Sequence, residues 1–202
     1  MRRTALYVGS VRWTALYVRS RQVPASLAAA VVSAAAVWAL SGGGSADPRL
    51  PALVLVAGTA AGSVGLGGQD LALDRTAAIR WAPRRAAHVL LIGTVAAAVL
   101  LAVRAVGDEA GEEAATAAFV VRDSAGLAGL VAVGAVLFGA QHAWTLPVAW
   151  LAFALFTPPG TGVPAQVATW MMLPPGTAAA TWTAAALAGG GTAAYALAGP
   201  RR

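Results

Sequence analysis

The sequence predicts an all-α, polytopic integral membrane protein with six transmembrane helices and a re-entrant helical element between the fifth and sixth helices. Of its 202 residues, 58% are hydrophobic and only 11% are charged, whereas soluble domains carry roughly 25% charged residues. The apolar residues gather in runs long enough to cross a bilayer, and Pro, Gly and charged residues separate the runs. A soluble fold could not bury so much apolar surface.

Composition also limits the kinds of covalent and metal site that the chain can have. The chain has no Cys, which excludes disulfides, thiolate metal sites and a Cys nucleophile. All 14 basic residues are Arg, and Ala, Gly, Pro and Val are abundant, which points to a high-GC bacterium.

The first 22 residues are polar and basic, and we expect a cytoplasmic interfacial segment there. A phrase that begins at Thr4 recurs from Thr14, but this period does not place the two copies on one helix face. Leu6, Trp13 and Tyr17 do share a face, which favours an interfacial helix with an aromatic stripe. The alternative is a solvated basic tail.

From residue 23 to residue 202 we expect a six-helix transmembrane domain. Its first span is Val23–Leu40, about 18 residues long. A cleaved signal peptide is the alternative, since Gly44–Ala46 resembles a cleavage site, but the apolar run begins late and is long for that purpose. The second span is Leu50–Gly67, where Gly58 and Gly62 form a GxxxG pattern that lets another helix approach closely.

The middle of the domain holds spans three and four. The third span is Ala86–Val106, and the acidic run Gly107–Glu113 follows it. This run could bind a hard cation but is more typical of a solvated exterior loop. We expect a short exterior helix over Ala114–Val121 and then the fourth span, Ser124–Ala140.

The last part of the chain alternates short apolar runs with Pro and Gly. A turn that contains His142 leads to a short fifth span, Trp144–Thr157, and we interpret His142 as interfacial rather than as a proton carrier. Val163–Leu173 is too short to cross and is predicted to be re-entrant. The sixth span is Thr177–Ala198, where Gly189–Gly191 predicts a bend or a close helix contact.

Charge then sets the orientation. Six spans place every arginine except Arg49, Arg104 and Arg122 on one side, which the positive-inside rule makes cytoplasmic. We therefore expect a multi-pass protein of the inner (plasma) membrane with both termini in the cytoplasm. The other side receives most of the acidic residues: Asp47, Asp108, Glu109, Glu112, Glu113 and Asp123.

No catalytic residue, metal site or cofactor is predicted in this chain, and we expect a transporter subunit rather than an enzyme. His88 and His142 lie at a loop boundary and in a turn, which does not suit an intramembrane serine protease. His-Glu-x-x-His is absent, as is the Lys-Ser/Thr of a phosphate loop. No acidic residue lies deep in a predicted span, so an ion-coupled carrier lacks its usual group.

The cytoplasmic loop 69–88 is the one polar interval long enough to bind a partner. A helix over residues 70–81 would be a rigid element between two spans, able to transmit force from a soluble motor. The alternative is that its arginines only hold the topology and attract anionic lipid. The residues that we assign to coupling are Asp70, Asp74, Arg75, Arg80, Trp81, Arg84 and Arg85.

The layout, together with the loop sequence QDLALDRTAAIRWAPRRAAHVLL, resembles the membrane subunit of ABC-2 type transporters. The chain is shorter than many such permeases, and only Asp70 and Asp74 stand where that family has a Glu-rich loop entry. The resemblance implies a homodimer, or a dimer with a related permease, bound to cytoplasmic ATP-binding subunits that carry ATP and Mg. It also implies export of an amphipathic peptide, antibiotic or lipid, with Trp170, Met171 and Met172 at the outer gate.

Two other classes stay open. A chain of this size with six spans also fits the substrate-binding membrane subunit of a vitamin importer. A small ligand tightly bound to the purified protein would favour that class. A non-transporting accessory protein of the bilayer is the third. Nothing in the sequence points to a nucleic-acid partner.

Overall fold

The computed structural model describes residues 47–67, 81–105, 113–158 and 160–201, together with residues 28, 31, 32 and 35 taken singly. Every regular element within these ranges is helical, which confirms the all-α prediction. The basic segment 1–22, most of the first predicted span, loop residues 68–80 and the acidic residues 108–112 lie outside the described ranges.

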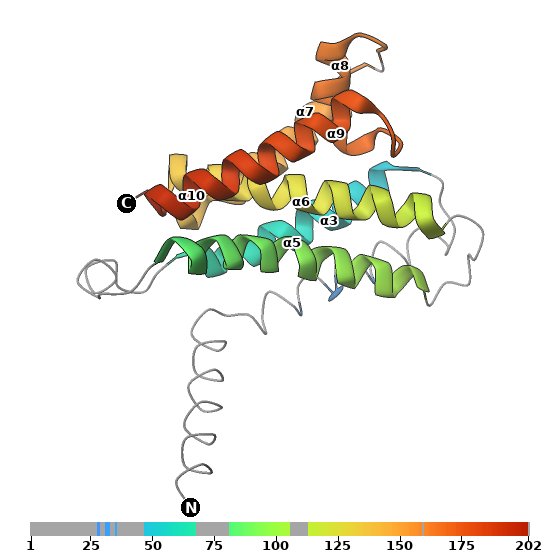
Figure 1. Ribbon diagram of the computed structural model, residues 1–202. Coiled ribbons are helices and arrows are strands. Elements are labelled where there is room, and N and C mark those ends of the chain that lie inside the picture. Colours follow the sequence, from blue (N-terminus) through green and yellow to red (C-terminus); the bar gives the residue numbers. More distant parts are fainter. Residues whose placement is uncertain are drawn as a thin grey trace, which may run out of the picture.

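In the described part of the chain, the helices α3, α5, α6 and α7 and the continuous helix α9–α10 follow one another and alternate in direction (Figure 1). The first is α3, which a 3-10 turn, η1, extends. The last is a continuous helix of α9, a π-helical turn called η4, and α10. The elements are α3 (Arg49–Ser63), η1 (Val64–Leu66), α5 (Trp81–Ala105), α6 (Glu113–Phe138), η2 (Ala140–His142), α7 (Thr145–Phe156), α8 (Val163–Ala168), η3 (Trp170–Met172), α9 (Ala178–Ala186), η4 (Leu187–Gly191) and α10 (Thr192–Ala198).

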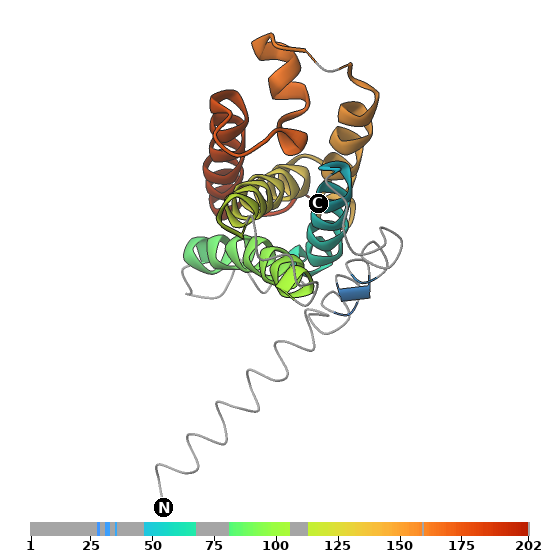
Figure 2. The same cartoon turned by 90° about the vertical axis from the view of Figure 1, so that its right-hand side faces the viewer.

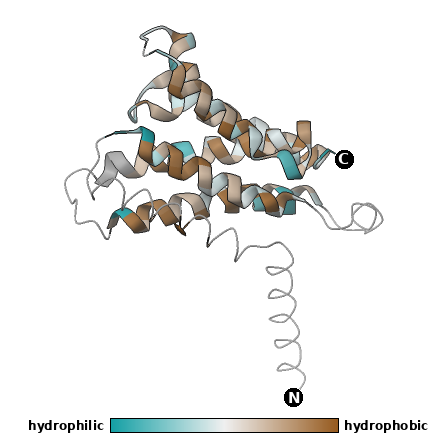
Figure 3. Cartoon of the chain, turned by 180° about the vertical axis from the view of Figure 1, so that it is seen from behind, coloured by the Kyte–Doolittle hydropathy of each residue, from teal (hydrophilic) through white to brown (hydrophobic). Residues whose placement is uncertain are grey.

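Three of the described helical stretches are long and apolar enough to cross a membrane: Arg49–Leu66, Trp81–Ala105 and Ala117–Phe138. They coincide with the second and third predicted spans and with most of the fourth, and the six crossings stay a prediction. Hydrophobic residues run along the described helices, with hydrophilic ones scattered among them (Figure 3). Large apolar side chains also stay uncovered on the surface, such as Phe156 at 86% exposure, which suits a lipid environment better than water.

Helix α6 is the centre of the bundle. It packs against α3, α5, α7, α9, η4 and α10, and an end-on view places it between them (Figure 2). In its most apolar window 67% of the residues are buried, against 33% for α5. Both apolar clusters of the described chain include α6 residues, such as Leu127 in one and Val131 in the other. The other helices are therefore positioned mainly through their contacts with α6.

Glycines on α6 let the neighbouring backbones come close. A Cβ at Gly129 would overlap the backbone of Leu187, and one at Gly191 would overlap the backbone of Gly129. A Cβ at Gly134 would lie 2.6 Å from the carbonyl oxygen of Ala143. The close helix contact predicted from the glycine triplet is thus confirmed at Gly191. The GxxxG prediction is confirmed at Gly62, where a Cβ would lie 2.8 Å from the Ile92 side chain on α5.

The beginning of α6 differs from the sequence prediction. We expected an exterior helix over Ala114–Val121 and a separate span from Ser124, but one helix runs through both segments. Arg122 and Asp123, expected in an exterior loop, therefore lie inside α6. The prediction was wrong because adjacent charges were taken to end a span. Here the two side chains form an ion pair with each other and pack against other elements, so the helix continues.

The segment between the fourth and sixth predicted spans consists of short helices. The predicted fifth span is α7, whose 12 residues give about 18 Å of helix. The predicted re-entrant element consists of α8 and η3, separated by Thr169. Whether α7 crosses the bilayer, and whether α8 enters it and returns, stay predictions.

The Gly129 contact gives a matched test of the packing. Gly129→Ala places a methyl group against the backbone of η4, and we expect it to lower the free energy of unfolding by about 1–3 kcal/mol or more, because backbone cannot move aside as a side chain can. Gly190→Ala, where a Cβ meets nothing within 4 Å, is the control. It should be neutral or stabilise by up to about 1 kcal/mol. Thermal unfolding of both variants in detergent measures the difference, and equal behaviour would contradict the contact.

Candidate functional site

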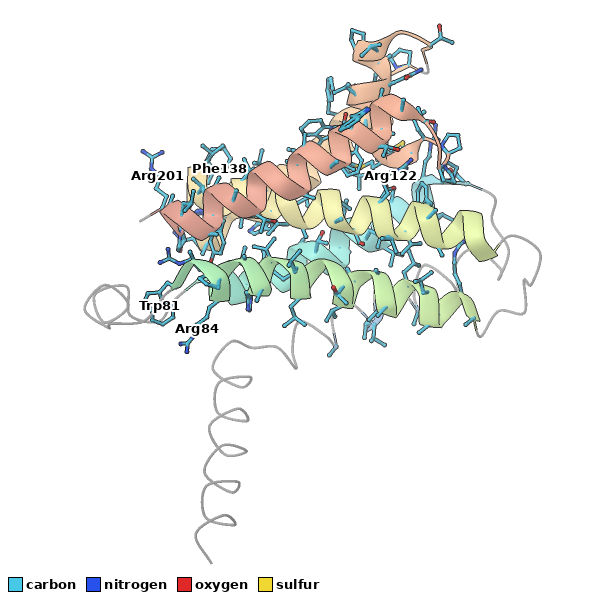
Figure 4. The ribbon with its side chains drawn as sticks, in the orientation of Figure 1. Trp81, Arg84, Arg122, Phe138 and Arg201 are labelled. Carbon is cyan, nitrogen blue, oxygen red and sulfur yellow. The ribbon has the colours of Figure 1, made fainter. Side chains whose placement is uncertain are left out.

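Polar side chains gather at the two opposite ends of the bundle, and each end is built differently (Figure 4). We call the first the Trp81 end. It comprises Trp81, Arg84 and Arg85 at the start of the described part of α5, the turn η2, and Arg201 after α10. We call the second the Arg122 end. It comprises Arg122 and Asp123 on α6 and the segment from Trp170 to Pro174.

At the Trp81 end, Arg84 is an exposed cation. Its guanidinium carbon lies 5.7 Å from the centre of the Trp81 ring, a cation–π arrangement between neighbours one helical turn apart. The indole nitrogen of Trp81 is buried and has no hydrogen-bond partner. The tryptophan thus holds Arg84 in place while the guanidinium faces outward, where a partner can reach it.

Arg85 has a different environment from Arg84. It is half-buried, and its guanidinium group lies against Gly199, just after α10. Gly199 has a φ of 72°, a left-handed conformation that favours glycine, and a Cβ there would also lie 2.9 Å from the Arg85 guanidinium carbon. Arg85 therefore packs the carboxyl end of the chain onto α5.

The carboxyl end is also hydrogen-bonded to α6. The backbone N–H of Arg201 donates to the Ala135 carbonyl at 2.9 Å, and its guanidinium donates to the Leu137 carbonyl at 3.1 Å. These carbonyls belong to the last turn of α6, and that of Ala135 also accepts from the backbone N–H of Gly139 at 3.1 Å. Within α10, the buried Tyr195 hydroxyl donates to the Leu66 carbonyl at 2.7 Å. Sequence reasoning used Arg201 only to set topology and missed this structural role.

The predicted coupling residues are only partly visible in this arrangement. Trp81, Arg84 and Arg85 come together at one end of α5, as part of that helix rather than of a loop before it. We had expected the helical loop to end at Trp81 and the third span to begin at Ala86. In the structure α5 is already helical at Trp81, and the start of the crossing at Ala86 stays a prediction. The remaining coupling residues, Asp70, Asp74, Arg75 and Arg80, lie outside the described ranges.

At the Arg122 end, one guanidinium group links two parts of the fold. Arg122 Nε donates to Asp123 Oδ1 at 2.7 Å, within α6. Its two terminal nitrogens donate to three backbone carbonyls about fifty residues later. These are Trp170 at 3.3 Å, Leu173 at 2.7 Å and Pro174 at 3.1 Å. The guanidinium carbon also lies 5.3 Å from the centre of the Phe119 ring, so the group meets an aromatic ring as well as the oxygens at its N–H edges.

Asp123 is a fully buried carboxylate, with 0% of its surface exposed. Its Oδ1 accepts from Arg122, whereas Oδ2 is buried without a hydrogen-bond donor. Asp123 lies within the apolar stretch Ala117–Phe138. The sequence analysis placed Asp123 outside the fourth span, whereas the structure places it inside this apolar helix. The cost of burying this charge is lowered by the ion pair, which makes the whole pair nearly neutral.

The three residues predicted to form an outer gate lie next to this pair. Trp170 and Met171 are fully buried and belong to the apolar core, while Met172 is half-buried. The indole nitrogen of Trp170 has no hydrogen-bond partner, whereas that of Trp150 donates to the Ala168 carbonyl at 3.0 Å. The segment Trp170–Met172 thus packs closely against the apolar core. A gating role for these residues stays a prediction.

The described residues offer little for catalysis or metal binding. Within these ranges, no group of three or more His, Asp or Glu side chains is placed to hold a metal ion. His142 is exposed in η2, as expected for a turn residue. His88 lies on α5, one turn beyond Arg84 and Arg85.

Comparison with known proteins gives no relative. No protein-family model matches the sequence, and neither a curated protein nor a solved structure matches the chain.

The Tyr195 bond predicts a measurable loss at the Trp81 end. Tyr195→Phe leaves the Leu66 carbonyl buried without its donor, and we expect a loss of about 1–2 kcal/mol in the free energy of unfolding. Thr94→Val is the matched control, because the exposed Thr94 hydroxyl bonds only to Leu90 of its own helix. Chemical unfolding in detergent should separate the two variants. Equal loss in both would contradict a special role for the Tyr195 bond.

Proposed function

We propose that the chain is the membrane subunit of an ATP-driven exporter of the ABC-2 type, with six spans and both termini in the cytoplasm. The Trp81 end is its cytoplasmic face, and a soluble ATP-binding subunit docks there. The observation that carries this proposal is the exposed Arg84, held on Trp81 at the point where the predicted coupling loop joins α5.

The arrangement of charge supports this orientation. Among the described residues, Arg84, Arg85 and Arg201 lie at one end of the bundle without an acidic side chain, whereas Arg49, Arg104 and Arg122 toward the other end are accompanied by Asp47 and Asp123. An excess of arginine is typical of the cytoplasmic side of a membrane protein. The alternating direction of α3, α5, α6, α7 and α9–α10 supports an odd number of crossings after residue 47, which together with a first span gives six.

The described surface has apolar faces on which a second permease subunit could pack. Apolar side chains stay exposed on α7 and on α9–α10, including Phe156, Trp182 and Leu197. Such faces suit contact with lipid or with a second permease. The substrate is proposed to be amphipathic, because a path between these faces would be lined by small and apolar side chains.

A second candidate rests on Asp123. A fully buried carboxylate inside a candidate span is a typical ion-binding group of carriers that use a proton or sodium gradient. Such a carrier needs no ATP-binding partner. Its transport would follow the ion gradient and would be lost in Asp123→Asn.

The partner decides between the two candidates. We expect the tagged protein, purified in mild detergent from its native cells, to retain an ATP-binding protein in near-equal amount. Arg84→Glu should reduce its recovery by about tenfold or more, since reversing an exposed charge at an interface replaces attraction by repulsion. Arg85 is a poorer choice for this variant, because it packs on Gly199 and its loss would also disturb the fold.

Arg104→Glu is the matched control, because it reverses a charge on the same helix in its last turn, at the opposite end. It should leave recovery of the partner unchanged. If the protein is purified alone, or if both variants lose the partner equally, the ATP-driven proposal fails. Transport in vesicles with an imposed ion gradient then tests the carrier candidate.

A further inference from the structure

We propose that Arg122 is the latch of the end opposite Trp81. It holds the segment Trp170–Pro174 closed over α6, and release of this guanidinium opens the buried interface between α6 and α9 without unfolding the bundle. As a device for transport the latch rests on the function proposed above, whereas its existence as a local closure does not.

Trp170 and Met171 pack in the apolar core, and the Pro174 carbonyl also accepts from the Thr177 hydroxyl at 3.0 Å, but the side-chain hydrogen bonds that tie the segment to α6 come from Arg122. η3 is a single 3-10 turn between Thr169 and Leu173, and Pro174 and Pro175 lack the N–H groups with which a backbone could bond to a neighbour. Three of its carbonyls, those of Trp170, Leu173 and Pro174, instead accept from one guanidinium group. A planar group with five N–H donors suits this task, because it can bond several oxygens at once.

Closing the segment seats a large side chain between two helices. A Cβ on Gly126 of α6 would lie 2.6 Å from Cη2 of Trp170 and 3.0 Å from Cα of Ala184 on α9. Trp170 therefore fills the space between α6 and α9 that the missing side chain of Gly126 leaves. When the segment moves away, this ring leaves with it, and the interface between the two helices opens where it is now sealed.

Asp123 sets the orientation of the Arg122 guanidinium group. It accepts from Nε of Arg122, which fixes the guanidinium so that its two terminal nitrogens point across to η3. Asp123 acts on the three carbonyls only by orienting Arg122, which makes it a positioning residue. The Trp170 indole nitrogen has no partner in the closed arrangement, so the ring is held by packing and by its backbone carbonyl alone.

The absence of cysteine from the sequence allows a clean accessibility test. A reporter variant, Met171→Cys, places a thiol at a site with 0% exposure beside the latch. The full chain is reconstituted in lipid nanodiscs and treated with a charged maleimide that cannot enter the apolar core. We expect slow labelling in the otherwise native chain. Arg122→Gln should raise the rate at least about tenfold, because several hydrogen bonds from a charged donor are lost at once.

Two matched controls separate the latch from general destabilisation. Arg104→Gln removes an arginine from the last turn of α5, near the same end, and should leave the labelling rate of Met171→Cys unchanged. Arg122→Lys keeps the charge but not the planar fork, so it should still speed labelling. A second reporter, Ala132→Cys, lies fully buried farther along α6 and should stay protected in every variant.

Each outcome decides the proposal. Faster labelling at Met171→Cys with Ala132→Cys still protected supports the latch. Faster labelling at both positions overturns it, because Arg122 then stabilises the fold as a whole, and unchanged labelling at both also overturns it. If Arg122→Gln cannot be purified, Asp123→Asn carries the same test, with a smaller expected rise at Met171→Cys alone. None of these readouts needs the ATP-binding partner, so failure of the latch and failure of the proposed function are distinguishable.

Discussion

The fold depends on the close approach of other backbones to α6 at its glycines. Gly129 meets the π-helical turn of the last helix, Gly134 meets the start of the η2–α7 connection, and Gly126 receives Trp170. In an apolar solvent the hydrophobic effect cannot drive helices together, so contact at van der Waals distance and hydrogen bonds must do so. This explains why α6 is more buried than its neighbours and why the glycine triplet of the last helix falls opposite Gly129.

An arginine donates to backbone carbonyls at each end of the bundle, but the charges at the two ends differ in exposure. Helix ends and connecting turns leave backbone carbonyls without partners, and each end supplies an arginine that donates to them. At one end Arg201 donates to the last turn of α6, and Arg84 stays exposed on Trp81. At the other end Arg122 is half-buried and paired with Asp123, and its donors meet Asp123 and the carbonyls of the Trp170–Pro174 segment. A basic face available to a partner and a sealed face follow from this difference.

Much of this fold could be predicted because apolar runs and their Pro and Gly boundaries are local signals. The second and third spans appear nearly where they were expected, and the contact at Gly191 follows from the triplet. The start of α6 could not be predicted, because the partners that let Arg122 and Asp123 enter the bundle lie about fifty residues away in sequence. For the same reason, Arg85 was assigned to coupling and Arg201 to topology, although the structure shows both packing the carboxyl end.

The orientation of the two ends across a membrane is the claim on which the proposed docking face and sealed face both depend. It is tested most directly by single-cysteine labelling in intact cells, with Thr161→Cys in the exposed turn before α8 and His142→Cys in the exposed turn η2. We predict that a membrane-impermeant maleimide labels Thr161→Cys in intact cells and labels His142→Cys only after the cells are permeabilised. Labelling of both positions from the same side would contradict the account, because α7 would then not cross the membrane.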